Sequence, residues 1–157
     1  MKRLGYSIII IAMSYLDFGC AHQRDGGALN LSVKTIKIDS WLNLMPGGPG
    51  SFHIAGEINL KNEECYEVTN LILSSITIIQ LDKKLYSFVP VFTAKIENGD
   101  NVIPSETEKE FLFYTKSGLP INKELDVELP VKLIMLFKEN DDSFLYEIEN
   151  IKVEKVY

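Results

Sequence analysis

From residue 29 onward the apolar residues alternate with polar ones at a period of two, and no window holds a sustained apolar stripe at the helical period. The clearest stretch is 52–60, in which Phe52 and Ile54 share one face while His53 and Glu57 share the other. This period is typical of a strand with one face on a core and the other in water, as in antiparallel sheets. The alternation therefore predicts an all-β domain and argues against a helical bundle.

Short clusters of glycine, proline, asparagine and aspartate separate the alternating runs and predict turns. Seven or eight such strands are expected to form an antiparallel two-sheet β-sandwich. The layout resembles immunoglobulin-like and fibronectin-type sandwiches in strand number and length, but the Cys-Trp-Cys pattern of antibody domains is absent, so the domain resembles no particular family. The predicted main strands span about 31–42, 52–60, 68–81, 85–96, 106–116, 131–138 and 144–157, with a short strand at 125–129.

Irregularities in the alternation predict where strands bend or end. The phase slips within residues 33–36 and again at residues 149–150, so a β-bulge is expected at each place. Pro90 interrupts the 85–96 run, and because proline lacks the donor of a sheet ladder, that run is expected at a sheet edge. The 68–81 run is apolar on both faces in places, which predicts a position in the interior of a sheet.

The first twenty residues have the three-part layout of a secretory signal. Two cations precede an apolar run over residues 4–16, and Gly19 stands just before Cys20. About twenty apolar residues are needed to cross roughly 30 Å of hydrocarbon, so this run is too short for a permanent transmembrane helix. We therefore expect a signal peptide over residues 1–19.

The Leu-Asp-Phe-Gly-Cys segment at 16–20 resembles the cleavage box of bacterial lipoproteins, in which a small residue precedes a cysteine that is acylated. The match is imperfect, because Asp17 and Phe18 stand where that family usually has small or aliphatic residues. The resemblance implies that Cys20 carries the lipid and becomes the mature N-terminus. It also implies a bacterial cell-envelope protein, membrane-anchored through Cys20, at the outer membrane or facing the periplasm if the cell has two membranes.

Residues 20–28 would then be a flexible tether, because paired glycines and polar side chains cannot bury enough surface to become ordered. The β-sandwich domain would span 29–157. The alternative is an ordinary cleaved signal with an incidental cysteine at this position. An acylated Cys20 would leave Cys65 as a single thiol, whereas an unacylated one would permit a disulfide between the two.

Charge and composition exclude several classes of function. Without residues 1–19 the chain has 14 basic and 21 acidic residues, a formal net charge of −7. Nucleic acid is therefore not an expected partner, since phosphate binding requires a basic face. No catalytic motif and no metal-ligand spacing is present, so neither enzymatic activity nor a cofactor is expected. The expected function is a non-catalytic interaction or structural module for an unknown protein or cell-surface polymer, with an unrecognised envelope enzyme as an alternative.

The most unusual segment is 41–53, which has three glycines and two prolines at 46–50 and is flanked by Trp41, Met45 and His53. It predicts a shaped loop between two strands. One interpretation is a binding loop, because aromatic and methionine side chains offer apolar contact area. Another is a tight crossover whose Trp41 and Met45 cap the core. A copper site using Met45 and His53 is a further alternative.

A second candidate contact is the predicted edge strand around Pro90. An edge strand has free backbone donors and acceptors on one side, and an extended segment of another chain can pair with them. The sequence therefore predicts two places for a partner, the 43–51 loop and this edge.

Overall fold

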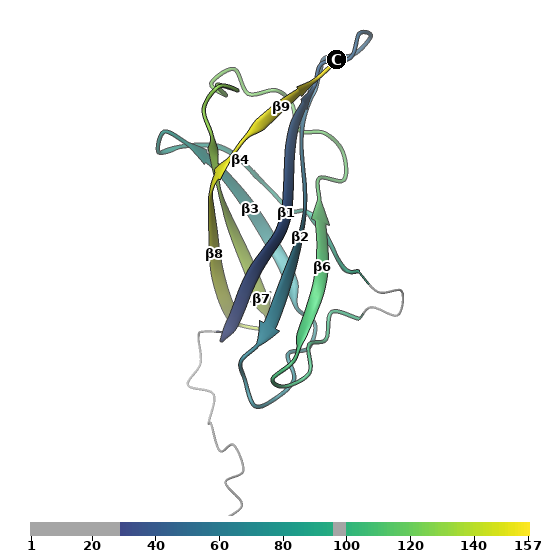
Figure 1. The fold of residues 1–157 in the computed structure, drawn as a ribbon, viewed down its shortest axis with the longest axis vertical. Helices are drawn as coiled ribbons and strands as arrows, with labels where there is room; N and C mark the ends of the chain where they lie inside the picture. The colour runs from purple at the N-terminus through teal and green to yellow at the C-terminus, as the bar shows by residue number, and fades with distance from the viewer. Residues whose placement is uncertain (1–28, 96–99) are drawn as a thin grey trace, which may run out of the picture.

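The computed structural model of the chain describes residues 29–95 and 100–157, which form nine β-strands and no helix (Figure 1). No helix in these two ranges is long and apolar enough to cross a membrane. The expected signal peptide at 1–19 and tether at 20–28 lie outside the described residues. The strands are β1 (Leu31–Asn43), β2 (Ser51–Asn62), β3 (Ile72–Gln80), β4 (Lys83–Phe88), β5 (Val91–Ala94), β6 (Glu108–Tyr114), β7 (Val131–Glu139), β8 (Asp142–Ile151) and β9 (Val153–Val156).

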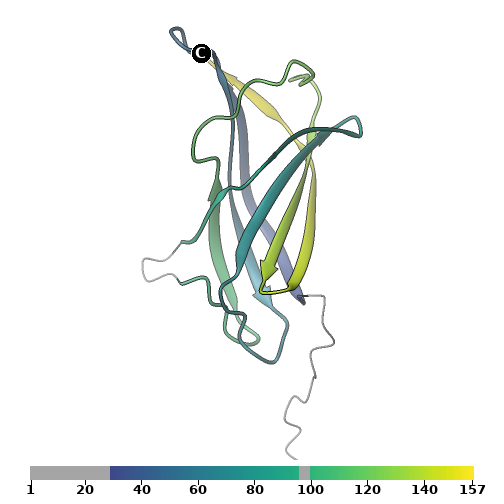
Figure 2. The same cartoon turned by 180° about the vertical axis from the view of Figure 1, so that it is seen from behind.

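The strands form two sheets that pack against each other, so the predicted two-sheet β-sandwich is confirmed (Figures 1 and 2). One sheet has the order β5-β6-β2-β1-β9 and the other the order β4-β3-β7-β8. The pairs are antiparallel except that β9 runs parallel to β1. The hairpin of β1 and β2 lies within the five-stranded sheet, and β3 and β7 lie within the four-stranded one.

The core lies between the sheets and consists of the alternate residues that the sequence pattern assigns to the inner faces. Burying a large aliphatic or aromatic side chain stabilises the fold by about 1.5–3 kcal/mol, and the alternation supplies such residues from every long strand. The predicted inner face of the 52–60 run is confirmed in β2, and β6 and β7 show the same alternation of buried and less buried residues. Their fully or almost fully buried members are Phe52, Ile54, Ile58, Leu60, Phe111, Phe113, Val131, Leu133, Met135 and Phe137.

Both predicted bulges are confirmed. The register of β1 against β2 shifts between Thr35 and Lys37. The register of β8 against β7 shifts where Ile148 and Ile151 pair with residues only two apart on β7. Asn150, inside this second bulge, has a left-handed backbone with a φ of 61°. Asparagine adopts this conformation at less cost than most residues, and the extra residue bends the strand.

That bend changes the path of the chain in a way that the alternation alone did not predict. The expected single strand over 144–157 is two strands, because β8 belongs to the four-stranded sheet while β9 belongs to the five-stranded one. The chain crosses from one sheet to the other at Lys152, whose carbonyl oxygen accepts a 2.7 Å hydrogen bond from the Ser40 hydroxyl. The bulge therefore positions the C-terminal strand beside β1.

Pro90 marks a second crossing. The expected strand over 85–96 is divided into β4 and β5, which are edge strands of different sheets, so the predicted edge position is confirmed. Proline suits the crossing because it contributes no donor to either ladder. The expected 68–81 run is the shorter β3, which has neighbours on both sides as predicted.

The expected short strand at 125–129 is wrong. This stretch forms turns, in which the amide of Leu125 donates to the Asn122 carbonyl and that of Leu129 donates to the Asp126 carbonyl. The buried Gln80 amide holds the loop through three hydrogen bonds, two of them to backbone groups of Asp126. The Gln80 side chain thus supplies hydrogen bonds to backbone groups of this loop, which a neighbouring strand would otherwise have to supply.

Candidate functional site

The 43–51 segment connects two adjacent antiparallel strands, so it is a hairpin loop. The expectation of a loop between two strands is confirmed, and the alternative of a crossover is wrong. Gly47 and Gly50 have φ values of 102° and 71°, which glycine adopts without a steric penalty. The Asn43 side-chain oxygen accepts a 3.1 Å hydrogen bond from the Met45 amide. The Leu44 amide donates at 2.7 Å to the carbonyl of Val156, which ties the hairpin to the C-terminal strand.

The structure brings two of the three predicted loop residues together. Trp41 and His53 are direct partners across β1 and β2, and their rings stack with centroids 5.2 Å apart and planes 8° apart. They alternate with the buried Leu42 and Phe52 and therefore lie on the outer face of the sheet. Met45 is 54% exposed at the hairpin tip, so the interpretation of Met45 as a core cap is wrong.

A second segment, residues 117–121, lies alongside the start of β2. The amide and carbonyl of Phe52 each form a 2.8 Å hydrogen bond with the backbone of Leu119. Next to this bridge, the Ser51 hydroxyl and the His53 Nε2 lie 2.8 Å apart. A Cβ on Gly118 would lie only 2.3 Å from the Ser51 Cβ and 2.7 Å from His53 Nε2. Only glycine permits this close backbone approach.

Replacing Gly118 by alanine should therefore lift residues 117–121 from the hairpin. We expect hydrogen exchange at the Leu119 amide to accelerate at least about tenfold, because its bond to Phe52 would open more often. The matched control is Gly48→Ala, since nothing lies within 4 Å of a Cβ at that glycine. Equal exchange in the wild type and Gly118→Ala would show that the close approach does not hold the segment.

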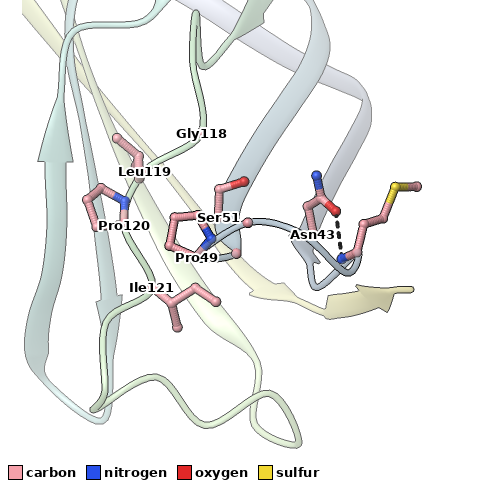
Figure 3. A pocket seen from close by; sticks show the side chains of 10 residues that line it. Asn43, Pro49, Ser51, Gly118, Leu119, Pro120 and Ile121 are labelled. Atoms are coloured by element: carbon pink, nitrogen blue, oxygen red, sulfur yellow. Dashed lines mark hydrogen bonds between the residues drawn. The ribbon is translucent and has the colours of Figure 1, made fainter.

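Between the hairpin and residues 117–121 lies a surface hollow of about 500 Å³, which we call the distal hollow (Figure 3). Ten residues line it and none of them is charged. Its apolar side chains are Met45, Pro49, Leu119, Pro120 and Ile121. The sequence predicted the 41–53 loop but not that residues 117–121 form the other wall of the same site. The Gly-Leu-Pro sequence at 118–120 was the feature from which a loop at this position could have been predicted.

Aromatic packing supports the distal hollow from within the sandwich. Phe52 is fully buried and stacks on Tyr86 with centroids 4.9 Å apart. The Tyr86 hydroxyl accepts a 2.8 Å hydrogen bond from the Asn122 amide, which holds the chain just after Ile121. Burial raises the pKa of the Tyr86 phenol, and the bond from Asn122 partly opposes that rise. The wall at 119–121 is therefore fixed to β4 as well as to β2.

In the described residues, the fold adds no further ligands to the hypothetical copper site of Met45 and His53. Across the two described ranges, no group of three or more histidine, cysteine, aspartate or glutamate residues could hold a metal ion. Met45 lines the distal hollow, whereas His53 does not, and its Nε2 is occupied by Ser51. A copper site would thus rest on Met45 and His53 alone, from different parts of the hairpin.

Two acidic side chains on the outer face of the five-stranded sheet are paired with one lysine. Lys95 contacts Glu57 and lies 2.9 Å from Glu110. These two hydrogen-bonded carboxylates, Glu57 first, raise the pKa of Lys95. On β6, Glu110 is therefore paired with a lysine and Glu108 accepts a 3.0 Å hydrogen bond from the Asn59 side chain, in contrast to the uncharged distal hollow.

The cysteine of the described region lies at the opposite end of the sandwich from the distal hollow. Cys65 follows the end of β2 and is disulfide-bonded. The sequence contains one other cysteine, Cys20, which lies outside the described residues. A sulfur that carries an acyl-glycerol thioether cannot also form a disulfide, so acylation at Cys20 and a Cys20–Cys65 bond exclude each other.

The fold and the site together define an all-β sandwich with an uncharged, loop-lined hollow at one end. No protein-family model matches the chain, and no curated protein matches it. The protein is therefore described by its β-sandwich architecture and by the uncharged residues that line the distal hollow.

Proposed function

We propose that the protein is a cell-envelope lipoprotein, membrane-anchored through an acylated Cys20, whose β-sandwich is a non-catalytic interaction module for a protein partner. The observation that carries this proposal is the position of the distal hollow relative to the start of the domain. A signal-like N-terminus supports the anchor, and an exposed uncharged hollow supports a binding role. The disulfide-bonded state of Cys65 opposes the anchor, because a bond between Cys65 and Cys20 would exclude acylation of Cys20.

The two ends of β1 give the geometry of such an arrangement. Leu31 pairs with Asn62 at one end, and Asn43 pairs with Ser51 at the other (Figure 1). Thirteen residues at about 3.3 Å each separate these ends by about 40 Å. The amide of Leu29 bonds to Ser143 in the β7–β8 hairpin, at the Leu31 end. An anchor that precedes Leu29 would leave the distal hollow facing away from the membrane.

A non-catalytic role is supported by the surroundings of the Ser51–His53 pair. A serine beside a histidine is a possible nucleophile and base, and a substrate carbonyl would need space about 3 Å from the serine oxygen. A Cβ on Gly118 would be 2.5 Å from Ser51 Oγ and 2.7 Å from His53 Nε2, so the backbone of residue 118 fills that space. The Ser51–His53 pair is therefore better suited to packing against the 117–121 segment than to catalysis.

The anchor is tested by the intact mass of the natively expressed protein from the membrane fraction. We expect a chain that starts at Cys20 and carries acyl mass. We also expect this chain to stay with the membrane, because each buried methylene of the acyl chains contributes about 0.8 kcal/mol to membrane binding. Cys20→Ser should abolish the added mass and release the protein, whereas the control Cys65→Ser should keep both. An unmodified, soluble wild-type chain would contradict the anchor.

A second candidate is an exported, unanchored binding protein with a Cys20–Cys65 disulfide, and the disulfide-bonded state of Cys65 favours it. The same mass experiment separates the two. This candidate predicts a soluble chain two hydrogens lighter than its reduced form, and either cysteine-to-serine variant would remove that difference.

A further inference from the structure

We infer that the distal hollow binds an uncharged aromatic side chain presented by a partner protein. This inference rests on the proposed role of the sandwich as an interaction module and is independent of anchoring at Cys20. Neither the β-sandwich fold nor a membrane anchor specifies the kind of side chain that would occupy the distal hollow.

The size and charge of the distal hollow define the first requirement. Its volume of about 500 Å³ falls within the roughly 300–1,000 Å³ typical of ligand sites. Charged residues make up 24% of the chain, yet none of the ten residues around the hollow is charged. A charged group placed there would lose hydration without gaining an opposite charge. The complementary occupant is therefore uncharged.

The polar groups of the distal hollow define the second requirement. The Asn43 side-chain oxygen already accepts the Met45 amide, and the Ser51 hydroxyl is already bonded to His53, so the Asn43 amide nitrogen is the side-chain donor that remains for an occupant. A sugar placed here would bury hydroxyls with few free partners, at a cost of about 1–3 kcal/mol for each unsatisfied group. This favours an apolar protein side chain over a cell-surface polysaccharide.

The apolar groups themselves favour an aromatic ring. Pro49 lies on the hairpin side and Pro120 on the opposite wall, so both supply flat ring surfaces (Figure 3). Proline surfaces and aromatic rings are a recurring pair in peptide recognition. Met45 adds an exposed thioether, and sulfur–aromatic contacts contribute about 0.3–1.5 kcal/mol. Tryptophan and tyrosine that fill such pockets commonly supply most of the binding energy of an interface.

A direct test uses methionine methyl groups as reporters. In the segment 20–157 the only methionines are Met45, at the distal hollow, and Met135, which is fully buried in the core. The purified exported protein, labelled with ¹³C at the methionine methyls, is titrated with N-acetyltryptophanamide. We expect a saturable ring-current shift of the Met45 methyl in the millimolar range and an unchanged Met135 methyl. Because N-acetylleucinamide and N-acetyllysinamide have no aromatic ring, they are tested by competition, and neither should displace the tryptophan probe from the distal hollow at the same concentration.

Gly48 offers a variant that changes the distal hollow without disturbing the fold. Nothing lies within 4 Å of a Cβ at this position, and its φ is outside the left-handed region. Gly48→Glu adds a carboxylate at the rim and should weaken tryptophanamide binding at least about tenfold. The matched control, Val89→Glu, adds the same charge at a 74% exposed residue that does not line the hollow, and it should bind like the wild type.

Three results would each overturn the inference. These are no saturable Met45 shift with the tryptophan probe, displacement of that probe by the leucine probe at the same concentration, and unchanged affinity in Gly48→Glu. The fluorescence of Trp41, the single tryptophan, verifies that each variant is folded. The outcome is separate from the intact-mass experiment, since a lipid at Cys20 and an aromatic contact at the distal hollow can each be present without the other.

Discussion

Replacing Asn62 by leucine should lower the free energy of unfolding by about 3–4 kcal/mol. The Asn62 side chain is fully buried, and its amide nitrogen donates to the carbonyls of Tyr66, Ile103 and Pro104 at 2.8, 3.1 and 3.3 Å. Its oxygen accepts the Glu64 amide at 2.9 Å. Leucine has a similar size but would leave these backbone groups without their partner, and each unsatisfied buried group costs about 1–3 kcal/mol.

Urea denaturation followed by Trp41 fluorescence measures this loss. The matched control is Asn43→Ala, which removes a single exposed hydrogen bond and should cost no more than about 1 kcal/mol. A loss in Asn62→Leu as small as that of the control would mean that water or a shifted backbone satisfies the groups around Asn62. The result would then contradict its role as the connection between the 63–66 turn and the 103–104 segment.

Replacing Gly56 by alanine should lower the free energy of unfolding by about 3 kcal/mol, the upper end for overpacking in a core. Gly56 pairs directly with Phe113 across β2 and β6. A Cβ at Gly56 would lie 2.4 Å from the Phe113 ring and 3.0 Å from the carbonyl oxygen of Lys37. Phe113 is only 1% exposed, so its ring has no free space into which it can move.

A double-mutant cycle isolates this contact. Phe113→Leu alone should cost about 1–2 kcal/mol through lost packing. Combined with Gly56→Ala it should cost clearly less than the sum of the two single changes, because the smaller side chain removes the clash. Simple additivity of the two losses, measured by urea denaturation, would show that the strain in Gly56→Ala arises elsewhere, for example at the Lys37 carbonyl.

Much of the fold could be predicted because the alternation of apolar and polar residues shows which residues of a strand are buried. A residue such as Ile54 is apolar because its position faces the core, and that relation holds along each strand whichever strand lies next to it. Phase slips in the pattern likewise located the bulges near Ile36 and Asn150. The same local logic marked the 41–53 segment as a loop, since its glycines and prolines suit no strand.

The sequence by itself thus determined the all-β class, the inner face of the 52–60 strand, the bulges and the loop within residues 41–53. Only the tertiary structure decided that the chain changes sheets at Pro90 and Lys152, and that Phe52 pairs with Leu119 to make the distal hollow. The physical reason is that burial leaves a periodic trace in neighbouring residues. Pairing between distant segments depends instead on which backbone edges meet when the two sheets close on their shared core, and a strand's own sequence does not record its partner.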